Sequence, residues 1–191
     1  MMTQTEPTDQ ELWAAVAAGD EAAFGTLFDR HSRAVYNHAF RLCGSWSVAE
    51  DITQATFLVA WRRRGTARLA HGTALPWLLV VAGNHARTEW RSARRRRALL
   101  GRLPAERGPD PADDVAGRLD DERAMGRILA AVRRLPRAER EAVALCLWSG
   151  VGYAEAAAAL GVTEVAVRSR VSRARARLAA LLGPDAEEED R

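Results

Sequence analysis

The last third of the chain predicts a helix with one apolar face and one arginine-bearing face. Residues three or four apart form the apolar face: Val167, Val171, Ala174 and Leu178. Arg168, Ser169 and Arg173 lie opposite, where an arginine can bond a guanine edge twice or bind a phosphate. A short helix over 153–160 and a turn at Gly161 precede it, and so tight a helical hairpin is commonly a DNA-binding one. An ordinary amphipathic helix with a solvated arginine face is the alternative.

A second candidate surface combines arginines with an aromatic ring. A helix expected from Pro76 to about Arg97 begins apolar and then becomes polar and basic. Its polar part carries Asn84, Arg87, Trp90 and Arg91. Interleaved aromatic and basic side chains suit the stacking of unpaired bases and the neutralisation of phosphates. A basic helix end that is simply solvated is the alternative.

A third candidate surface would bind protein. The helix expected from Val48 to Arg64 has apolar side chains on two opposite sides. One side carries Ile52, Ala55 and Val59. The other carries Phe57, Leu58 and Trp61, together with Glu50 and Gln54. The first side can pack in the protein's own core and leave the second for a partner protein, although a helix buried all round in a bundle fits the same pattern.

Composition excludes several kinds of chemistry. All 28 basic residues are arginine, so the chain has no phosphate-binding loop ending in lysine, no Schiff-base nucleophile and no lysine general base. Cys43 and Cys146 stand far apart without neighbouring ligands, and we expect both to be buried. The histidines do not fall into a metal-ligand spacing either. We therefore predict no catalytic residue, no metal site and no cofactor.

The N-terminus and the apolar runs predict a cytoplasmic protein without membrane insertion. The first ten residues are polar and acidic, unlike a signal peptide. The longest apolar stretch, Leu75 to Ala82, contains Pro76 and is far shorter than the roughly 18 residues that a membrane span needs.

The elements that position these surfaces are all helices, because apolar residues recur at three and four rather than alternating. We expect an N-terminal helical bundle over 9–98, a flexible linker over 99–119 and a helix-turn-helix domain over 120–182. A disordered N-terminus over 1–8 and an acidic tail over 183–191 complete this all-α chain.

Short motifs mark several helix ends. Thr8 with Glu11, and Ser47 with Glu50, each predict a capping box at a helix start. Asp20 predicts a further N-cap and Gly44 a helix end.

Charge is segregated along the chain. Residues 87–107 contain eight arginines against Glu89 and Glu106, whereas residues 108–124 contain six acids against two arginines. Five more acids lie within 185–190. We hypothesise that the acidic linker and tail fold back onto the arginine-rich surfaces and weaken DNA binding by the free protein.

An ordered set of motifs connects these surfaces. The N-terminal module contains Gly19-Asp20 with Ala23-Phe24, then Ala49-Glu50-Asp51-Ile52-Thr53-Gln54 with Phe57 and Trp61, then Pro76-Trp77-Leu78 with Ala82-Gly83-Asn84. The C-terminal module contains Leu135-Pro136, Val167-Arg168-Ser169-Arg170-Val171 and Arg173-Ala174-Arg175. In this order the motifs resemble an extracytoplasmic-function (ECF) sigma factor, the small two-domain type of bacterial transcription initiation factor in the sigma-70 superfamily. Ala156 and Ala166 depart from the usual residues of that family.

The resemblance implies a role for each surface and no enzymatic activity of the chain itself. Residues that would dock on core RNA polymerase, through its beta-prime and beta subunits, are Glu50, Asp51, Gln54, Phe57 and Trp61. Residues that would hold the melted strand of the minus-ten promoter element are Asn84, Arg87 and Arg91, with the loop 65–73. Residues that would read the minus-thirty-five element are Arg168, Ser169, Arg170 and Arg173. An inhibitory anti-sigma factor is a further partner that the resemblance implies.

Two other functions compete with this one. A stand-alone helix-turn-helix regulator would bind a palindromic operator as a dimer, without polymerase. An enzyme acting on nucleic acid would need a carboxylate cluster or a His/Cys constellation, which the sequence does not show.

Overall fold

A computed structural model describes residues 6–100, 125–126 and 128–182, and within them every regular element is a helix. This confirms the predicted all-α class. The N-terminal residues 1–5, most of the predicted linker and the acidic tail lie outside the described residues. So does the hypothesis that linker and tail cover the arginine-rich surfaces.

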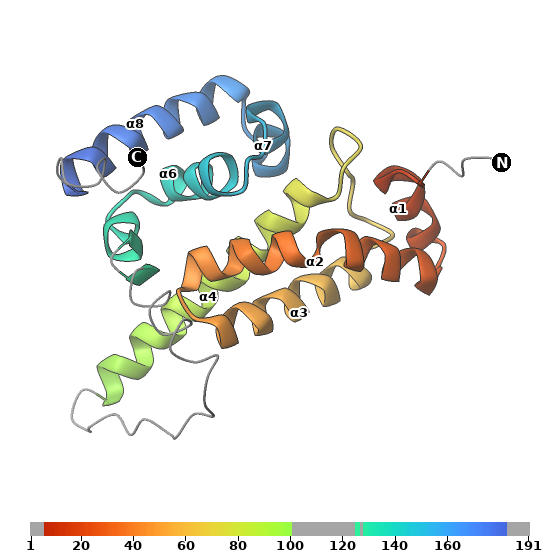
Figure 1. Ribbon diagram of the computed structural model, residues 1–191, viewed down its shortest axis with the longest axis horizontal. Coiled ribbons are helices and arrows are strands. Elements are labelled where there is room, and N and C mark those ends of the chain that lie inside the picture. Colours follow the sequence, from red (N-terminus) through yellow and green to blue (C-terminus); the bar gives the residue numbers. More distant parts are fainter. Residues whose placement is uncertain (1–5, 101–124, 127, 183–191) are drawn as a thin grey trace.

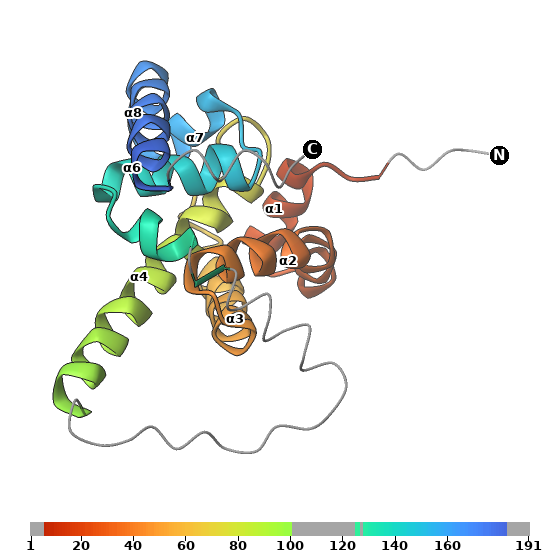
Figure 2. The ribbon, with the colours of Figure 1, turned by 60° about the vertical axis from the view of Figure 1, so that its left-hand side comes forward.

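Four helices form the N-terminal unit. They are α1 (Asp9–Ala17), α2 (Glu21–Cys43), α3 (Trp46–Arg62) and α4 (Leu75–Leu100). Each of α2, α3 and α4 contacts the other two, and α1 packs against α2 (Figure 1). The C-terminal half of α4 extends away from this bundle (Figure 2).

The C-terminal unit begins with helical residues at 125–126 and 128–133. It continues through α6 (Arg137–Ala142), the π-helix η1 (Val143–Trp148), α7 (Tyr153–Leu160) and α8 (Glu164–Leu182). Helix α8 packs on α6 and α7, and its apolar face is buried as predicted, since Val167 and Ala174 are fully enclosed. Gly161 ends α7 in the left-handed conformation that favours glycine and turns the chain into α8.

Helix ends follow the predicted motifs with one exception. Thr8 and Glu11 form the predicted capping box, and Asp20 accepts from the backbone N of Ala23 at 3.0 Å. The predicted box of Ser47 with Glu50 is wrong, because α3 already begins at Trp46 with Ser45 as N-cap. Ser47 thus lies inside the first turn, where its side chain no longer faces free backbone donors.

The two units are packed against each other in the described residues. Helix α4 contacts η1 and α7, and α2 contacts η1 (Figures 1 and 2). A single apolar cluster runs across the junction and includes Leu42 and Leu79 from the first unit with Ala144 and Leu145 from the second. We call this junction, where α6, η1 and α7 meet α2 and α4, the seam. The sequence predicted two modules held only by a linker, and it gave no sign of this contact.

Candidate nucleic-acid and protein-binding surfaces

The first surface is an aromatic groove between α2 and α3. Its lining residues are Glu21, Phe24, Phe28, Gln54, Phe57, Leu58 and Trp61. The aromatic rings contact one another in pairs. The ring centroids of Phe28 and Phe57 are 4.7 Å apart, and those of Phe24 and Trp61 are 5.2 Å apart. Phe28 is 40% exposed and Leu58 48% exposed, which is unusual for large apolar side chains so close together.

The predicted division of α3 into two faces is partly wrong. Phe57 is only 4% exposed, because Phe24 and Phe28 of α2 cover it, whereas Ala55 and Val59 of the supposed core side are half-buried. Phe57 therefore forms the floor of the groove. Of the other predicted docking residues, Trp61 is half-buried at the groove, Gln54 lines it from an exposed position, and Glu50 and Asp51 are exposed earlier on the same helix.

The second surface is the polar part of α4. Asn84 and Arg91 are exposed, while Arg87 is half-buried and bonds the Asn84 side chain through its Nη2. Trp90 is also half-buried, one turn from Arg87. The structure thus brings the three predicted residues and Trp90 onto one stretch of helix.

The loop that precedes α4 is held by a buried carboxylate that sequence reasoning missed. Asp9 is 7% exposed, and its Oδ2 accepts from the backbone N of Ala74 at 2.8 Å and from Thr73 Oγ1 at 3.2 Å. The same oxygen lies 2.7 Å from His31 Nε2, and Arg30 Nη1 donates to Oδ1 at 2.8 Å. Burial opposes ionisation of Asp9, but these bonds outweigh it and lower its pKa below the ordinary value.

This network explains how a long loop can keep a fixed form. It ties α1 and α2 to the end of the loop, where α4 begins. His71 within the loop adopts a positive φ of 58°, next to Gly72 at 72°. Arg64, near the start of the loop, lies over the Trp61 ring at 4.3 Å from its centroid. The only sequence signal for Asp9 was its place after the capping threonine.

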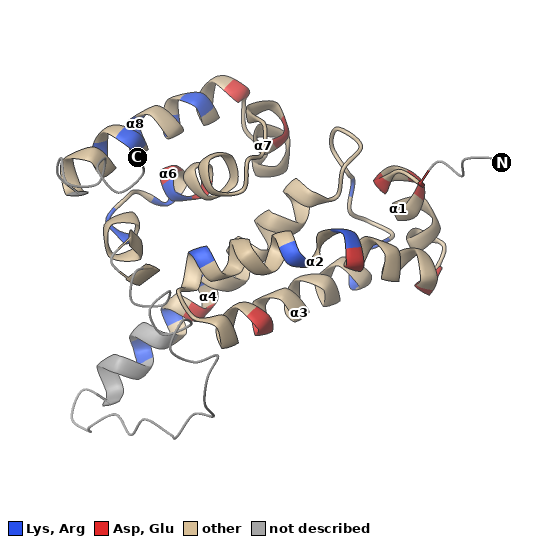
Figure 3. Ribbon diagram, in the orientation of Figure 1, with Lys and Arg blue, Asp and Glu red and all other residues tan. Residues whose placement is uncertain are grey.

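The third surface is the arginine face of α8. Arg168 and Arg173 have side chains 65% and 56% exposed, and arginines recur along α8 (Figure 3). Arg173 donates to Ser169 Oγ at 2.6 Å, while Ser169 and Arg170 are half-buried. Thr163 caps the start of the helix by accepting from Ala166 N at 3.2 Å. The four predicted residues thus lie within the first ten residues of this helix.

A buried carboxylate on α6 pairs with two arginines of α8. Glu139 is 4% exposed, with Oε1 3.4 Å from Arg173 Nε and Oε2 3.2 Å from Arg177 Nε. The second contact is an ion pair without hydrogen-bond geometry. Because a buried charge needs compensation, these two arginines hold the orientation of α8 on α6.

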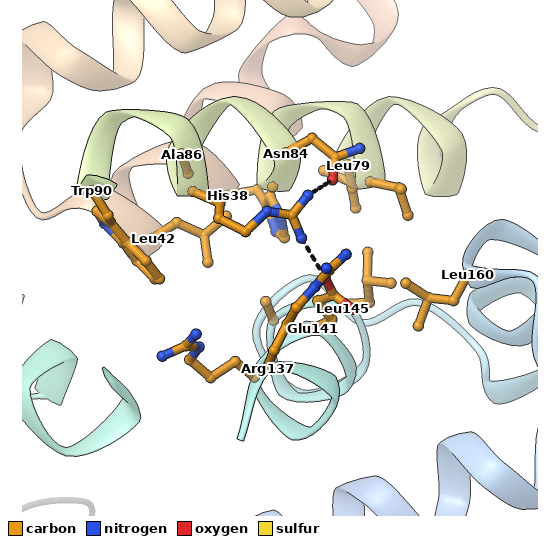
Figure 4. A pocket seen from close by; sticks show the side chains of 15 residues that line it. His38, Leu42, Leu79, Asn84, Ala86, Trp90, Arg137, Glu141, Leu145 and Leu160 are labelled. Atoms are coloured by element: carbon orange, nitrogen blue, oxygen red, sulfur yellow. Dashed lines mark hydrogen bonds and ion pairs between the residues drawn. The ribbon is translucent and has the colours of Figure 1, made fainter. Parts of the chain in front are cut away.

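Polar contacts also cross the seam. Arg87 Nη1 donates to Glu141 Oε1 at 2.9 Å (Figure 4). His38 Nδ1 lies 2.7 Å from Ser149 Oγ. Arg41 donates to the backbone oxygen of Trp148. His38 is 1% exposed; its burial, reinforced by the charge of Arg41, lowers its pKa to about 4.

Metal and thiol chemistry find no further support in the described part of the chain. No group of three His, Cys, Asp or Glu side chains there could hold a metal ion. The two cysteines are half-buried rather than buried as predicted, and burial raises the pKa of Cys146. No helix among the described residues is long and apolar enough to span a membrane.

Comparison with known proteins assigns both units. Sigma-70 region 2 matches residues 27–96, and Sigma-70, region 4 matches residues 125–178. RNA polymerase sigma factor NccH of Alcaligenes xylosoxydans xylosoxydans is 36% identical over 185 residues, which cover 93% of this chain and 97% of NccH. Several other relatives are described as ECF RNA polymerase sigma factors.

Two solved structures share the fold over most of the chain. The structure of CnrH in complex with the cytosolic domain of CnrY has a TM-score of 0.68 at 30% identity and covers 94% of this chain and 98% of CnrH. RpoE in complex with the anti-sigma factor NepR from Bartonella quintana has a TM-score of 0.59 at 29% identity, over 85% of this chain and 98% of RpoE. These likenesses do not favour a stand-alone dimeric regulator. The chain therefore belongs to the ECF group of the sigma-70 family of RNA polymerase sigma factors.

Proposed function

We propose that this chain binds core RNA polymerase and directs it to specific promoters in the cytoplasm, without a catalytic site of its own. The aromatic groove between α2 and α3 is the observation that carries the proposal. Phe28 and Leu58 expose large apolar surface there, and the acids Glu50 and Asp51 stand on the same helix as Leu58. Such a patch beside charged groups is typical of a protein interface.

Within this proposal the polymerase contacts the groove and the exposed start of α3. The residues of this chain that dock on the beta-prime and beta subunits are Glu50, Asp51, Gln54, Phe57 and Trp61. Phe57 acts from the floor of the groove, by holding Phe24 and Phe28 in place. The polymerase performs all covalent chemistry.

Promoter DNA is bound by the other two surfaces. Asn84, Arg87 and Arg91, with the loop before α4, hold the melted strand of the minus-ten element. Flipping a base out of the duplex costs a few kcal/mol in lost stacking and pairing. A loop that Asp9 already holds in place does not have to be ordered when the base binds, so capture of the base costs less free energy. Residues on α8 read the minus-thirty-five element in the major groove: Arg168, Ser169, Arg170 and Arg173. Residues 9–98 and 120–182 are accordingly the two functional domains.

An anti-sigma factor is proposed as a further partner of this chain. Its support is the fold shared with RpoE, which was solved with the anti-sigma factor NepR. Co-purification from the source organism, at the chain's natural level, identifies the protein that binds.

Run-off transcription tests the main proposal. Core polymerase is incubated with fragmented genomic DNA, with or without the protein, and the transcript 5′ ends are sequenced. We expect new start sites that share one upstream sequence. If the protein neither binds core polymerase nor adds any start site, the proposal is wrong.

The groove is tested by Leu58→Asp, which places a charge on an exposed apolar position. We expect polymerase binding to weaken at least about 10-fold, since an interface anchor contributes more than about 1.4 kcal/mol. Thr26→Asp is the matched control, because it adds the same charge at an exposed position of α2 outside the groove lining. Equal binding by both variants would remove the groove from the interface. Circular dichroism checks that both stay folded.

A further inference from the structure

Val165, in the first turn of α8, is the most exposed large apolar side chain in the part of the chain that the structure describes. It is 77% exposed, against 48% for Leu58 and 41% for Ile128. Exposed apolar residues that stand singly are common and need no function. The position of Val165 on its helix therefore decides whether it has one.

Val165 lies on the helix face that carries the proposed DNA-reading residues. Residues three and four positions apart share a face of an α-helix, so Arg168 and Ser169 lie on the same side as Val165, one turn further along. Val167, two positions away, is fully buried in the core. Helix α8 lies on the side of the C-terminal unit that is away from α2 and α4 (Figures 1 and 2). Val165 thus stands on the outer face of the molecule, beside an arginine.

That arginine is held in place by two neighbours. Arg168 Nη2 donates to Glu164 Oε1 at 2.5 Å, and the guanidinium lies 5.5 Å from the ring centroid of Tyr153 on α7. The ion pair and the cation–π contact both restrict the side chain before any DNA binds. Arg168 and Val165 therefore present one polar and one apolar contact at a fixed spacing.

The chemistry of valine limits what Val165 can recognise in the major groove. Its side chain has no donor and no acceptor, so it cannot bond a base edge or a phosphate. The C5 methyl group of thymine is the apolar group that base pairs present in that groove. Residues near the start of a recognition helix reach base edges, and in zinc-finger helices residues three positions apart contact successive bases. The spacing of Val165 and Arg168 fits a thymine beside a guanine.

We propose that Val165 is a specificity-determining residue, which packs on the methyl group of a thymine in the minus-thirty-five element, next to the base pair that Arg168 contacts. The inference rests on the proposed function of α8. Contact between the valine and the methyl group removes apolar surface of both from water, which stabilises the complex without a hydrogen bond. The element should therefore contain a guanine and a thymine in adjacent base pairs.

Deoxyuridine in place of thymidine tests this contact, because it removes only the methyl group. The element is taken from the start sites that run-off transcription identifies, and binding of the holoenzyme to duplex promoter fragments is measured by competition. For the wild type, one such replacement should weaken binding about fourfold, the equivalent of about 0.8 kcal/mol for one buried methyl group. If no replacement within the element weakens binding, the proposal is wrong.

Val165→Ser supplies the protein half of a double-mutant cycle. Serine and valine have similar helix propensities and the position is exposed, so the fold should be kept, which thermal unfolding checks. The variant should bind the thymine fragment about as weakly as the wild type binds the deoxyuridine fragment, and lose nothing further with deoxyuridine. Val165→Ile should keep the methyl dependence. Ala180→Ser, at an exposed position near the other end of α8, is the matched control and should behave as the wild type.

An equal loss with deoxyuridine in the wild type and in Val165→Ser would assign the methyl contact to another residue. Selection from duplexes randomised over the element gives a second readout, which a general loss of binding would not reproduce. Holoenzyme with Val165→Ser should lose the preference for thymine at one position and keep its preferences elsewhere. An unchanged preference at every position, or a loss at all of them, contradicts the assignment.

Failure of this inference is distinguishable from failure of the proposed function. If the wild type yields no start site in run-off transcription, the proposed function is rejected, and the role of Val165 with it. Start sites whose binding does not depend on a thymine methyl group reject the role of Val165 alone.

Discussion

At the residue scale, Asp9 shows how one side chain serves a distant surface. It stands at the first position of α1, yet its carboxylate receives bonds from Arg30, His31 and Ala74. Removing one member of a buried charged network leaves the others uncompensated.

We predict that Asp9→Asn lowers the free energy of unfolding by about 3 kcal/mol, because an amide cannot accept from this set of donors. Urea denaturation at pH 7 measures the change. The exposed Asp29→Asn should alter stability by less than about 0.5 kcal/mol. If both variants lose a similar amount of unfolding free energy, the bonds of Asp9 do not stabilise the fold more than an exposed acid does.

The pH dependence of Asp9 has a definite sign. Its pKa is lower in the folded protein than the ordinary value of 3.8, so its stabilisation is complete above that value. As the pH falls through the depressed folded pKa, the stabilisation is lost. The stability difference between wild type and Asp9→Asn should therefore shrink below pH 3.8.

Sequence patterns predict which side chains share a helix face, but they do not predict the partners of buried polar groups. The four residues on α8 and the three on α4 were predicted from helical spacing and family motifs, both of which are local in sequence. Asp9, His38 and Glu141 act through partners 21 to 111 positions away. Contacts over such separations depend on how helices pack, which local periodicity does not encode.

At the element scale, the arginines of α8 pair with one buried and one exposed glutamate. Glu139 is buried beneath it and pairs with Arg173 and Arg177, whereas Glu164 at its start pairs with Arg168 on the surface. The first pair joins two helices, while the second is an i,i+4 pair within one helix.

We predict that Glu139→Ala destabilises the protein by about 1.5–3 kcal/mol, because it removes the buried carboxylate that joins α6 to Arg173 and Arg177. Glu164→Ala should cost at most about 0.5 kcal/mol, as is usual for exposed pairs within a helix. Thermal unfolding of both variants measures the contrast. Comparable losses would show that Glu139 does not fix α8.

Helix boundaries were predicted well where a capping side chain or a left-handed glycine marks them. Thr8, Asp20 and Gly44 act as predicted, but α3 starts at Trp46 after Ser45, which makes no side-chain cap bond. The π-helix η1 had no sequence signal either. It ends at the residues that cross the seam, Trp148 and Ser149, so a local widening of the helix serves a tertiary contact.

At the scale of the whole molecule, the seam makes the arrangement of the two units sensitive to acid. His38 is enclosed between α2, Leu79 of α4 and Ala144 of η1. The charge of Arg41, on its own helix, acts on the imidazole. The other charged groups that line the same cleft are Arg87 on α4, and Glu141 with Arg137 and Arg140 on α6. Opening the seam would remove η1 and return the imidazole toward its ordinary pKa of 6.5.

The sign of this effect follows from the depressed pKa. Well above pH 6.5 the imidazole is neutral in both states, and it contributes no pH dependence. Between pH 6.5 and about 4 the exposed imidazole binds a proton that the buried one does not, so acid favours opening. Across the whole interval the effect amounts to at most about 3 kcal/mol.

We therefore predict that the radius of gyration of the free protein rises between pH 7.5 and pH 5, and that His38→Gln reduces this rise. Glutamine keeps a polar group near Ser149 but cannot take up a proton in this range. The other three histidines are common to both proteins, so the difference between the two scattering profiles isolates His38. Identical expansion of both proteins would mean that other groups govern any opening by acid. Expansion confined to the wild type would place the control of the seam on one buried imidazole.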